Sequence, residues 1–197
     1  MLRDYSALTS VMLQPGVGYA QPSQTLPEKV TLEDSALQVF TDFQRTTAVI
    51  ILSGDTMDEA HRRMIQRGVR LLLVVDQDRK VMGVITANDI LAEKPVQMIA
   101  QRGIRREELL VRDVMTPQER LDVLSFADVR AAKVGHVVAS LRKSGRQHAV
   151  VVEVEDTGRQ KVRGVFSATQ IARQLGVTIQ TSQVALTFSE IEAMLAR

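Results

Sequence analysis

Apolar side chains recur at helical spacing in the stretch that follows Thr56. They stand at positions 0, +3 and +7 of one face and are Met57, Ala60 and Met64. Glu59 follows Thr56 by three residues, a pairing in which a hydroxyl and a carboxylate reciprocally satisfy free amides at a helix start. Gly68 can adopt the left-handed conformation that ends a helix. The pattern therefore predicts an amphipathic helix between Thr56 and Gly68.

The pattern of this helix returns later in the chain with the same spacing. Adding 77 to the three apolar positions and to the terminating glycine gives Val134, Val137, Leu141 and Gly145. Because the apolar face and the glycine shift together, the two segments are predicted to be copies of one structural unit. Neither copy alone could cover a sheet, so the two are expected to pack together.

Strands and turns repeat around the two helices as well. The matching segments are 39–41 and 114–116 at an offset of 75, the apolar strands 71–75 and 149–152, and 83–90 and 164–171 at an offset of 81. The rising offsets indicate small loop insertions, including a longer second turn around 155–161. Each copy should contain a lead-in, a short strand at 48–52 or 123–126, the helix and a hairpin. A closing helix should then begin near Ala87 or Ala168.

The remaining stretches complete the domain organisation. Pro95 can occupy a first helical turn and Gly103 can end it, which predicts a linker helix over 95–102. Thr187 or Ser189 can cap a short C-terminal helix. We therefore expect an extended N-terminal arm at 1–31, a first repeat at 32–94, a linker region at 95–110, a second repeat at 111–176 and a C-terminal extension at 177–197.

The composition narrows the class of protein. The 197 residues are 45% hydrophobic and 24% charged, which is typical of a globular chain. No apolar run approaches the roughly 20 residues of a membrane helix, and cysteine is absent, so we expect a cytoplasmic protein without disulfides. A net charge of +2, with 4% aromatic residues and scattered arginines, argues against nucleic-acid binding. The three histidines form no metal-ligand pair and no nucleophile stands beside an oriented base, so we expect neither a metal site nor an enzyme.

Two stretches resemble the signature of the cystathionine-β-synthase-type domain, or CBS domain, which occurs in tandem pairs. They are residues 68–76 (GVRLLLVVD) and 83–90 (GVITANDI), and the entry to the second copy at 113–117 (DVMTP) agrees with them. The resemblance covers roughly residues 32–176. It implies an α+β fold in which two β-α-β-β-α repeats pack through their sheets as one module and leave two clefts.

The resemblance also implies a regulatory function. The clefts of similar proteins hold AMP, ADP, ATP, NAD or S-adenosylmethionine, and their occupancy regulates an attached or partner protein. Such modules commonly associate into flat discs, which implies a homodimer. The adenosine-containing ligand would be regulatory and no cofactor would be required, while the effector protein stays unidentified. The alternative is a ligand-free dimeric platform for protein interaction.

The chemistry of the first signature agrees with this implication. Thr86 stands where a helix begins and Asp89 follows three residues later, so both can face one cleft. An ionised carboxylate can accept hydrogen bonds from both hydroxyls of a ribose, and Thr86 with the helix amides can hold a phosphate or ribose oxygen. The same two residues are equally suited to capping the closing helix. In the second signature Ser167 is retained, but Gln170 replaces the carboxylate and cannot make the charge-assisted contact. The second cleft is therefore either a ligand site without this contact or a packed but empty cleft.

Further site residues follow from the resemblance. Arg70 and His148, with Arg146 nearby, are the candidates for phosphate contact. Short side chains in the lead-in segments would line the adenine. The first ligand site is therefore expected to comprise Thr46, Thr47, Ala48, Arg70, Gly83, Ile85, Thr86 and Asp89. The second is expected to comprise Thr116, Val123, Arg146, His148, Phe166, Ser167 and Gln170.

Overall fold

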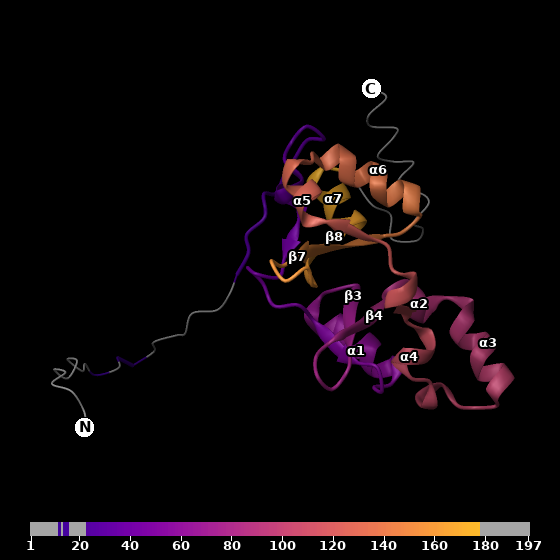
Figure 1. Ribbon diagram of the computed structural model, residues 1–197. Helices are drawn as coiled ribbons and strands as arrows, with labels where there is room; N and C mark the ends of the chain where they lie inside the picture. Colours follow the sequence, from indigo (N-terminus) through magenta and orange to yellow (C-terminus); the bar gives the residue numbers. More distant parts are fainter. Residues whose placement is uncertain (1–11, 13, 16–22, 178–197) are drawn as a thin grey trace.

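Two four-stranded sheets organise the part of the chain that the computed structural model describes, namely residues 12, 14–15 and 23–177. One sheet has the order β2-β3-β4-β5, with strands β2 (Ile50–Leu52), β3 (Leu71–Val75), β4 (Val81–Thr86) and β5 (Thr116–Pro117). The other has the order β1-β8-β7-β6, with strands β1 (Thr41–Asp42), β6 (Val123–Ser125), β7 (His148–Val154) and β8 (Gln160–Ser167). Figure 1 shows the two halves as adjacent bodies, one carrying α1 to α4 and the other α5 to α7.

Helices cover the outer faces of the sheets, and apolar side chains fill the space between the sheets. The helices are α1 (Met57–Arg67), α2 (Ala87–Leu91), α3 (Glu93–Arg102), α4 (Val111–Val114), α5 (Phe126–Ala131), α6 (Val134–Ser144) and α7 (Ala168–Gln174). Short 3-10 helices lie at η1 (Ala36–Val39), η2 (Arg106–Glu108) and η3 (Gln118–Arg120). Leu71, Leu73, Val84 and Val150 form a buried cluster that joins the two sheets. The predicted α+β fold with sheet-to-sheet packing is confirmed.

The two halves share details that only copies of one unit would share. In each half a parallel strand pair, β2 with β3 or β6 with β7, is followed by an antiparallel hairpin. The hairpins carry the same irregularity, between Val74 and Val75 in one and between Val151 and Val152 in the other. The internal duplication read from the sequence is therefore a duplication of structure.

The helices α1 and α6 lie where the repeated pattern predicts them. Their apolar faces are buried, and each ends at a left-handed glycine, Gly68 with φ 63° and Gly145 with φ 64°. The Thr56 hydroxyl accepts a hydrogen bond from the Glu59 amide at 3.2 Å, as expected of an N-cap. The Glu59 carboxylate does not return to Thr56 but pairs with Arg63 at 2.9 Å, so the predicted cap is made in one direction only.

Some boundaries differ from the prediction. Helix α3 begins at Glu93, two residues before the expected Pro95, because a proline within a first turn gives up an amide that would be unpaired anyway. The strand expected at 123–126 ends at Ser125, and the unpredicted α5 follows it. The C-terminal helix expected after Thr187 or Ser189 lies outside the described residues, as does most of the expected N-terminal arm.

The lead-in strands are exchanged between the halves. The sequence pattern assigned each lead-in to the repeat that follows it. In the structure β1, the lead-in strand of the first repeat, pairs antiparallel with β8 of the second repeat. Strand β5, the lead-in strand of the second repeat, pairs antiparallel with β4 of the first. Each sheet is therefore completed by a segment from the other side of the chain, and neither half is independent.

Two glycines permit this exchange. A Cβ on Gly83 would overlap the carbonyl oxygen of Thr116 in β5, and a Cβ on Gly164 would overlap that of Thr41 in β1. The Phe40 ring is packed against Gly164 as well. Backbone carbonyls cannot move aside as a flexible side chain can, so glycine is required at these two positions of strand pairing.

A buried ion pair also fastens β1 to the second repeat. Asp42 is 7% exposed, and its carboxylate accepts two hydrogen bonds at 2.9 Å from the Arg163 guanidinium on β8. Arg163 also pairs with Glu153 at 3.0 Å and lies 4.0 Å from the centre of the Phe126 ring. The hydrogen bonds from Arg163 hold the pKa of Asp42 below its usual range.

Among the described residues, no helix reaches the length and hydrophobicity that crossing a bilayer requires.

Alanine in place of Gly83 or Gly164 should destabilise the fold. Gly83→Ala and Gly164→Ala should each lower the free energy of unfolding by about 3 kcal/mol, the upper end of overpacking costs. Gly54→Ala is the matched control, since nothing lies within 4 Å of its added Cβ. Denaturation midpoints in urea measure all three variants. A Gly83→Ala midpoint equal to that of Gly54→Ala would refute the steric explanation.

The stability contributed by Asp42 should depend on pH. Its folded-state pKa is lowered, so the contribution is complete above the unfolded pKa of about 4 and disappears as the pH falls through the folded value. Asp42→Asn should cost about 2 kcal/mol at pH 7 and flatten the acid limb of the stability curve. Glu33→Gln, which breaks the exposed pair with Lys133, should change stability little. An unchanged acid limb in Asp42→Asn would contradict this assignment.

Candidate functional site

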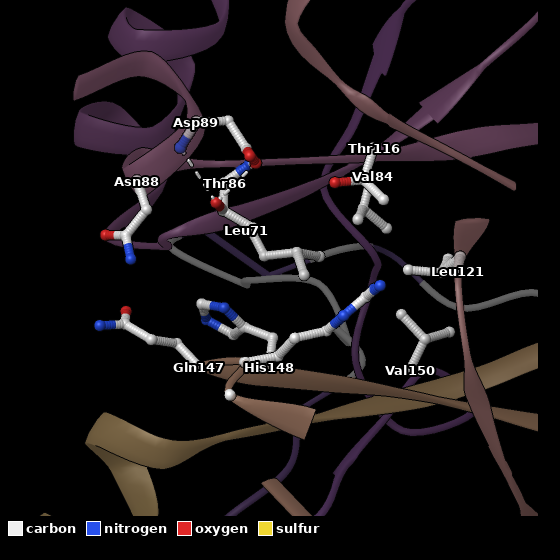
Figure 2. Close-up of a pocket in the computed structure, with 12 residues that line it drawn as sticks. Leu71, Val84, Thr86, Asn88, Asp89, Thr116, Leu121, Gln147, His148 and Val150 are labelled. Atoms are coloured by element: carbon white, nitrogen blue, oxygen red, sulfur yellow. Dashed lines mark hydrogen bonds between the residues drawn. The ribbon is translucent and has the colours of Figure 1, made fainter. Parts of the chain in front are cut away.

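One cavity of about 350 Å³ lies between the two repeats where the closing helix α2 begins. We call it the Asp89 cleft. It is lined by Leu71, Val84, Thr86, Asn88, Asp89, Thr116, Leu121, Gly145, Arg146, Gln147, His148 and Val150. Figure 2 shows Thr86, Asn88 and Asp89 on one wall, with Gln147 and His148 projecting toward them from the opposite wall. The cleft is therefore built by both repeats.

A second cavity of about 320 Å³ lies where the closing helix α7 begins, and we call it the Gln170 cleft. It is lined by Thr41, Phe43, Thr46, Thr47, Val49, Gly68, Val69, Arg70, Leu71, His148, Val165, Ser167, Thr169, Gln170 and Arg173. Its parts match those of the Asp89 cleft through the internal duplication. Ser167 and Gln170 correspond to Thr86 and Asp89, and the turn 68–71 corresponds to the turn 145–148.

The clefts combine the expected residues differently from the sequence assignment. Thr46, Thr47 and Arg70, which were grouped with Asp89, line the Gln170 cleft instead. Thr116 and Arg146, which were grouped with Gln170, line the Asp89 cleft. The physical reason is the packing of the repeats. Each cleft takes its closing helix from one repeat and its glycine turn from the other, so residues near in sequence face different cavities.

Other expected site residues line neither cleft. Ile85 and Phe166 are 0% exposed and lie in the cores beneath the helices. Gly83 contacts β5, where it serves the strand exchange. Ala48 lines a separate, larger cavity, and Val123 is partly exposed at the start of β6. Period-two alternation along a strand explains the first two, because neighbours of a cleft residue point to the opposite face.

Thr86 and Asp89 hydrogen-bond to each other at the N-terminus of α2. One Asp89 carboxylate oxygen accepts hydrogen bonds from the Thr86 amide at 2.8 Å and the Thr86 hydroxyl at 2.7 Å. The Thr86 hydroxyl in turn lies 3.3 Å from the Asp89 amide, whose hydrogen bond it accepts. This is a capping box, so the capping interpretation of the pair is correct. The same two side chains line the cleft, so capping and cleft formation occur together.

The equivalent pair in the Gln170 cleft is weaker. The Ser167 hydroxyl accepts from the Gln170 amide at 3.5 Å, and the Gln170 side chain donates to Gln174 at 3.4 Å. Gln174 is buried and donates to two backbone carbonyls of the N-terminal segment, those of Pro27 and Gln38. Gln170 is thus tied to a structural amide network, and the carboxylate found at Asp89 has no counterpart here.

His148 lies at the wall between the clefts, because it lines both cavities. Its Nδ1 atom is buried and has no hydrogen-bond partner among the described residues. Burial, helped by the charge of Arg70, lowers the pKa of His148 to about 4. The imidazole is therefore neutral at pH 7 and can offer one donor and one acceptor, but no positive charge for the phosphate contact expected of it.

The arginines near the clefts differ in what they contact. The Arg146 guanidinium donates to the backbone carbonyl of Arg120 at 2.8 Å. Arg70 is exposed, and within the described chain it makes no ion pair. Among the described residues no group of three or more possible metal ligands is present.

Sequence reasoning missed several lining residues. These are Asn88 and Thr169, which follow the capping hydroxyls by two positions, Gln147 next to His148, Leu121 after β5, and Arg173 on α7. Asn88 and Thr169 could have been found from the duplication, because they occupy equivalent positions in the two signatures. Leu121 and Arg173 carry no such signal, since only the packing of the repeats brings them to a cavity.

Comparison with known proteins by sequence gives one family match and no curated relative. The family model described as "CBS domain" matches residues 39–95. No curated protein matches the sequence.

Solved structures share the fold at low identity. An uncharacterized conserved protein from Pyrococcus horikoshii has a TM-score of 0.54 at 19% identity, covering 78% of this chain and 100% of its own. A CBS domain protein of unknown function from Thermoplasma acidophilum has a TM-score of 0.50 at 19% identity, covering 80% and 77%. CBSX2 from Arabidopsis thaliana, solved in complex with AMP, has a TM-score of 0.49 at 18% identity, covering 71% and 94%.

The family match and the duplicated geometry agree. The matched segment contains α1, the β3–β4 hairpin and α2, and the second half repeats this arrangement with the same bulge and the same terminating glycine. Residues 39–95 therefore match the CBS-domain model, and the described part of the chain has the fold of a CBS-domain pair.

Proposed function

We propose that this protein is a non-catalytic regulatory module that binds an adenosine-containing ligand between its two CBS repeats. The ligand class comprises AMP, ADP, ATP, NAD and S-adenosylmethionine. The observation that carries the proposal is the position of Thr86 and Asp89. They stand at the start of a helix, on the wall of a cavity of about 350 Å³ that both repeats build.

The chemistry of this wall suits a ribose. One Asp89 oxygen accepts hydrogen bonds from Thr86, and the other accepts none from the described residues. An ionised carboxylate can accept from both hydroxyls of a diol in charge-assisted bonds. Leu71, Val84 and Val150 supply apolar surface on which an adenine ring can lie. Asn88 and Gln147 offer amide donors and acceptors beside it.

A second candidate is a platform for protein interaction that binds no ligand. The capping box favours it, because Thr86 and Asp89 already satisfy each other and need no ligand for their hydrogen bonds. The two candidates differ in one measurable respect. Only the first expects the fold to be stabilised by adenosyl compounds.

Ligand-induced stabilisation tests the choice. At a concentration of about 100 times the dissociation constant, a ligand stabilises the folded state by about 2.7 kcal/mol, which should raise the melting midpoint by about 5 °C or more. Melting curves with AMP, ADP, ATP, NAD and S-adenosylmethionine measure the effect. If all five leave the midpoint unmoved, the ligand-free platform is the correct function.

Asp89→Asn should weaken the ligand that occupies the Asp89 cleft by about tenfold or more, because the charge-assisted bonds to the ribose are lost. Asp34→Asn is the matched control. Asp34 accepts from the amide and hydroxyl of Thr31 at 2.6 and 2.9 Å, the same local arrangement, yet it lines neither cleft. Titration calorimetry measures the ligand affinity of both variants, and a loss in Asp89→Asn alone is a loss of a ligand contact. An equal loss of affinity in Asp34→Asn would show that Asp89 does not contact the ligand.

We also propose that the module forms a homodimer that acts on an effector protein, as the CBS resemblance implies. The chain has a mass of 21.9 kDa, so a dimer should scatter light with about twice that mass. Light scattering after size exclusion, at several protein concentrations, checks this expectation. A mass that stays at one chain throughout would contradict it.

A further inference from the structure

A third cavity, of about 1000 Å³, lies at the turn ends of the two hairpins, and we call it the Arg79 cavity. Its walls come from α1, from the segment 43–50, and from the ends of the β3–β4 and β7–β8 hairpins. Neither Thr86 nor Ser167 lines it, so it contains no start of a closing helix. Thr47 and Val49 line both this cavity and the Gln170 cleft, so the two share one wall.

The floor of the Arg79 cavity is apolar. Ile50, Val81 and Val162 line it, and all three pack against the buried cluster that joins the sheets. They are only half-buried, so part of their apolar surface is open to the cavity. Such a floor can hold the apolar body of a small molecule, and the volume lies at the upper end of ligand pockets.

Positive charge prevails among the side chains above this floor. Three of the cations already have carboxylate partners. Arg63 pairs with Glu59 at 2.9 Å, and Lys161 lies 3.9 Å from a carboxylate oxygen of Glu155. Arg163 pairs with Asp42 and Glu153, as described above.

The other two cations, Arg67 and Arg79, are exposed and pair with no carboxylate of the described residues. Asp78, the acidic neighbour of Arg79 in the hairpin turn, lies 3.8 Å from Lys80 instead. The cavity therefore presents two uncompensated guanidinium groups, from α1 and from the β3–β4 turn.

Arg79 adopts a backbone conformation that is unusual for an arginine. It has φ 62° and is the only residue other than glycine with a positive φ in the described chain. Its amide donates to the Asp76 carbonyl at 3.1 Å, just as the Gly158 amide donates to the Glu155 carbonyl at 2.8 Å in the other hairpin. Gly158 has φ 78°, so glycine serves this turn without strain. A strained arginine beside a cavity indicates a role for its side chain.

The second repeat shows that the fold does not need these arginines. On α6, the positions of Arg63 and Arg67 are held by Ser140 and Ser144, and the position of Arg79 is held by Gly158. The helix and the hairpin form in both repeats all the same. The positive charge is therefore a property of this cavity and not of the repeated unit.

The edge of β2 is closed to an added strand. The Ile50 carbonyl accepts from the Arg63 guanidinium at 2.8 Å, and the Leu52 amide donates to the Asp55 carboxylate at 3.3 Å. Side chains thus occupy backbone groups that an extended peptide would pair with. This favours a small molecule over a peptide as the occupant of the cavity.

We propose that the Arg79 cavity binds an amphipathic organic anion, with its apolar body on Ile50, Val81 and Val162 and its carboxylate or phosphate held by Arg67 and Arg79. Guanidinium groups suit both kinds of head group, because each offers several donors in one plane. This site is separate from the two clefts, and its occupation does not require an adenosyl compound.

The probe is anilinonaphthalene sulfonate, an aromatic anion whose fluorescence rises on apolar surface. Octanoate and octyl phosphate should displace it at concentrations about tenfold lower than octanol, which has the same chain without a charge. Inorganic phosphate, which has the charge without the chain, should displace it no better than octanol does.

Variants that carry the residues of the second repeat locate the site. Arg79→Gly and Arg67→Ser should each weaken octanoate by about threefold, and the double variant by about tenfold. Arg79→Gly should leave the melting midpoint unchanged or raise it, because glycine relieves the strained turn.

Two controls each remove one exposed positive charge. Lys143→Gln does so at a residue that lines none of the three cavities, and Arg70→Gln does so in the Gln170 cleft. Both should leave the affinity for octanoate unchanged.

Three results would overturn the proposal. The first is displacement by octanol as strong as that by octanoate, and the second is a double variant that loses no more affinity than Lys143→Gln. The third is an equal loss in Arg70→Gln, which would place the anion in the Gln170 cleft. These measurements contain no adenosyl compound, so the proposed function is judged separately by its own melting curves.

Discussion

The exchange of two short strands is the constraint on which the rest of this structure depends. Strand β5 pairs with β4 at Gly83 and β1 pairs with β8 at Gly164, each at a distance that leaves no room for a Cβ. Because each sheet is completed by a strand from the other repeat, each repeat depends on the other for a complete sheet. The ion pair between Asp42 and Arg163 also joins β1 to β8.

The position of the clefts follows from this arrangement. The sheets meet through Leu71, Leu73, Val84 and Val150, and Leu71 of this contact lines both cavities. A cavity wall therefore comes from both repeats, with a capped helix start on one side and a glycine-ended helix on the other. A ligand held there would contact both repeats at once.

The two repeats share their backbone geometry and differ in the chemistry of their clefts. Corresponding positions hold Asp89 and Gln170, or Leu71 and His148, within the same backbone frame. Asp89 and Gln170 each line one cavity, whereas Leu71 and His148 line both, and Leu71 also belongs to the buried cluster between the sheets. The clefts therefore differ in their polar groups, while the turns and paired strands around them stay equivalent.

The sequence by itself determined the elements and their duplication, because helix periodicity, caps and left-handed glycines such as Gly68 and Gly145 are local properties of the chain. It also singled out Thr86 and Asp89, whose spacing is local. Only the tertiary structure decided which residues share a cavity. Arg70 and Asp89 stand in one repeat but face different clefts, since strand exchange and sheet packing bring together segments that no sequence spacing relates.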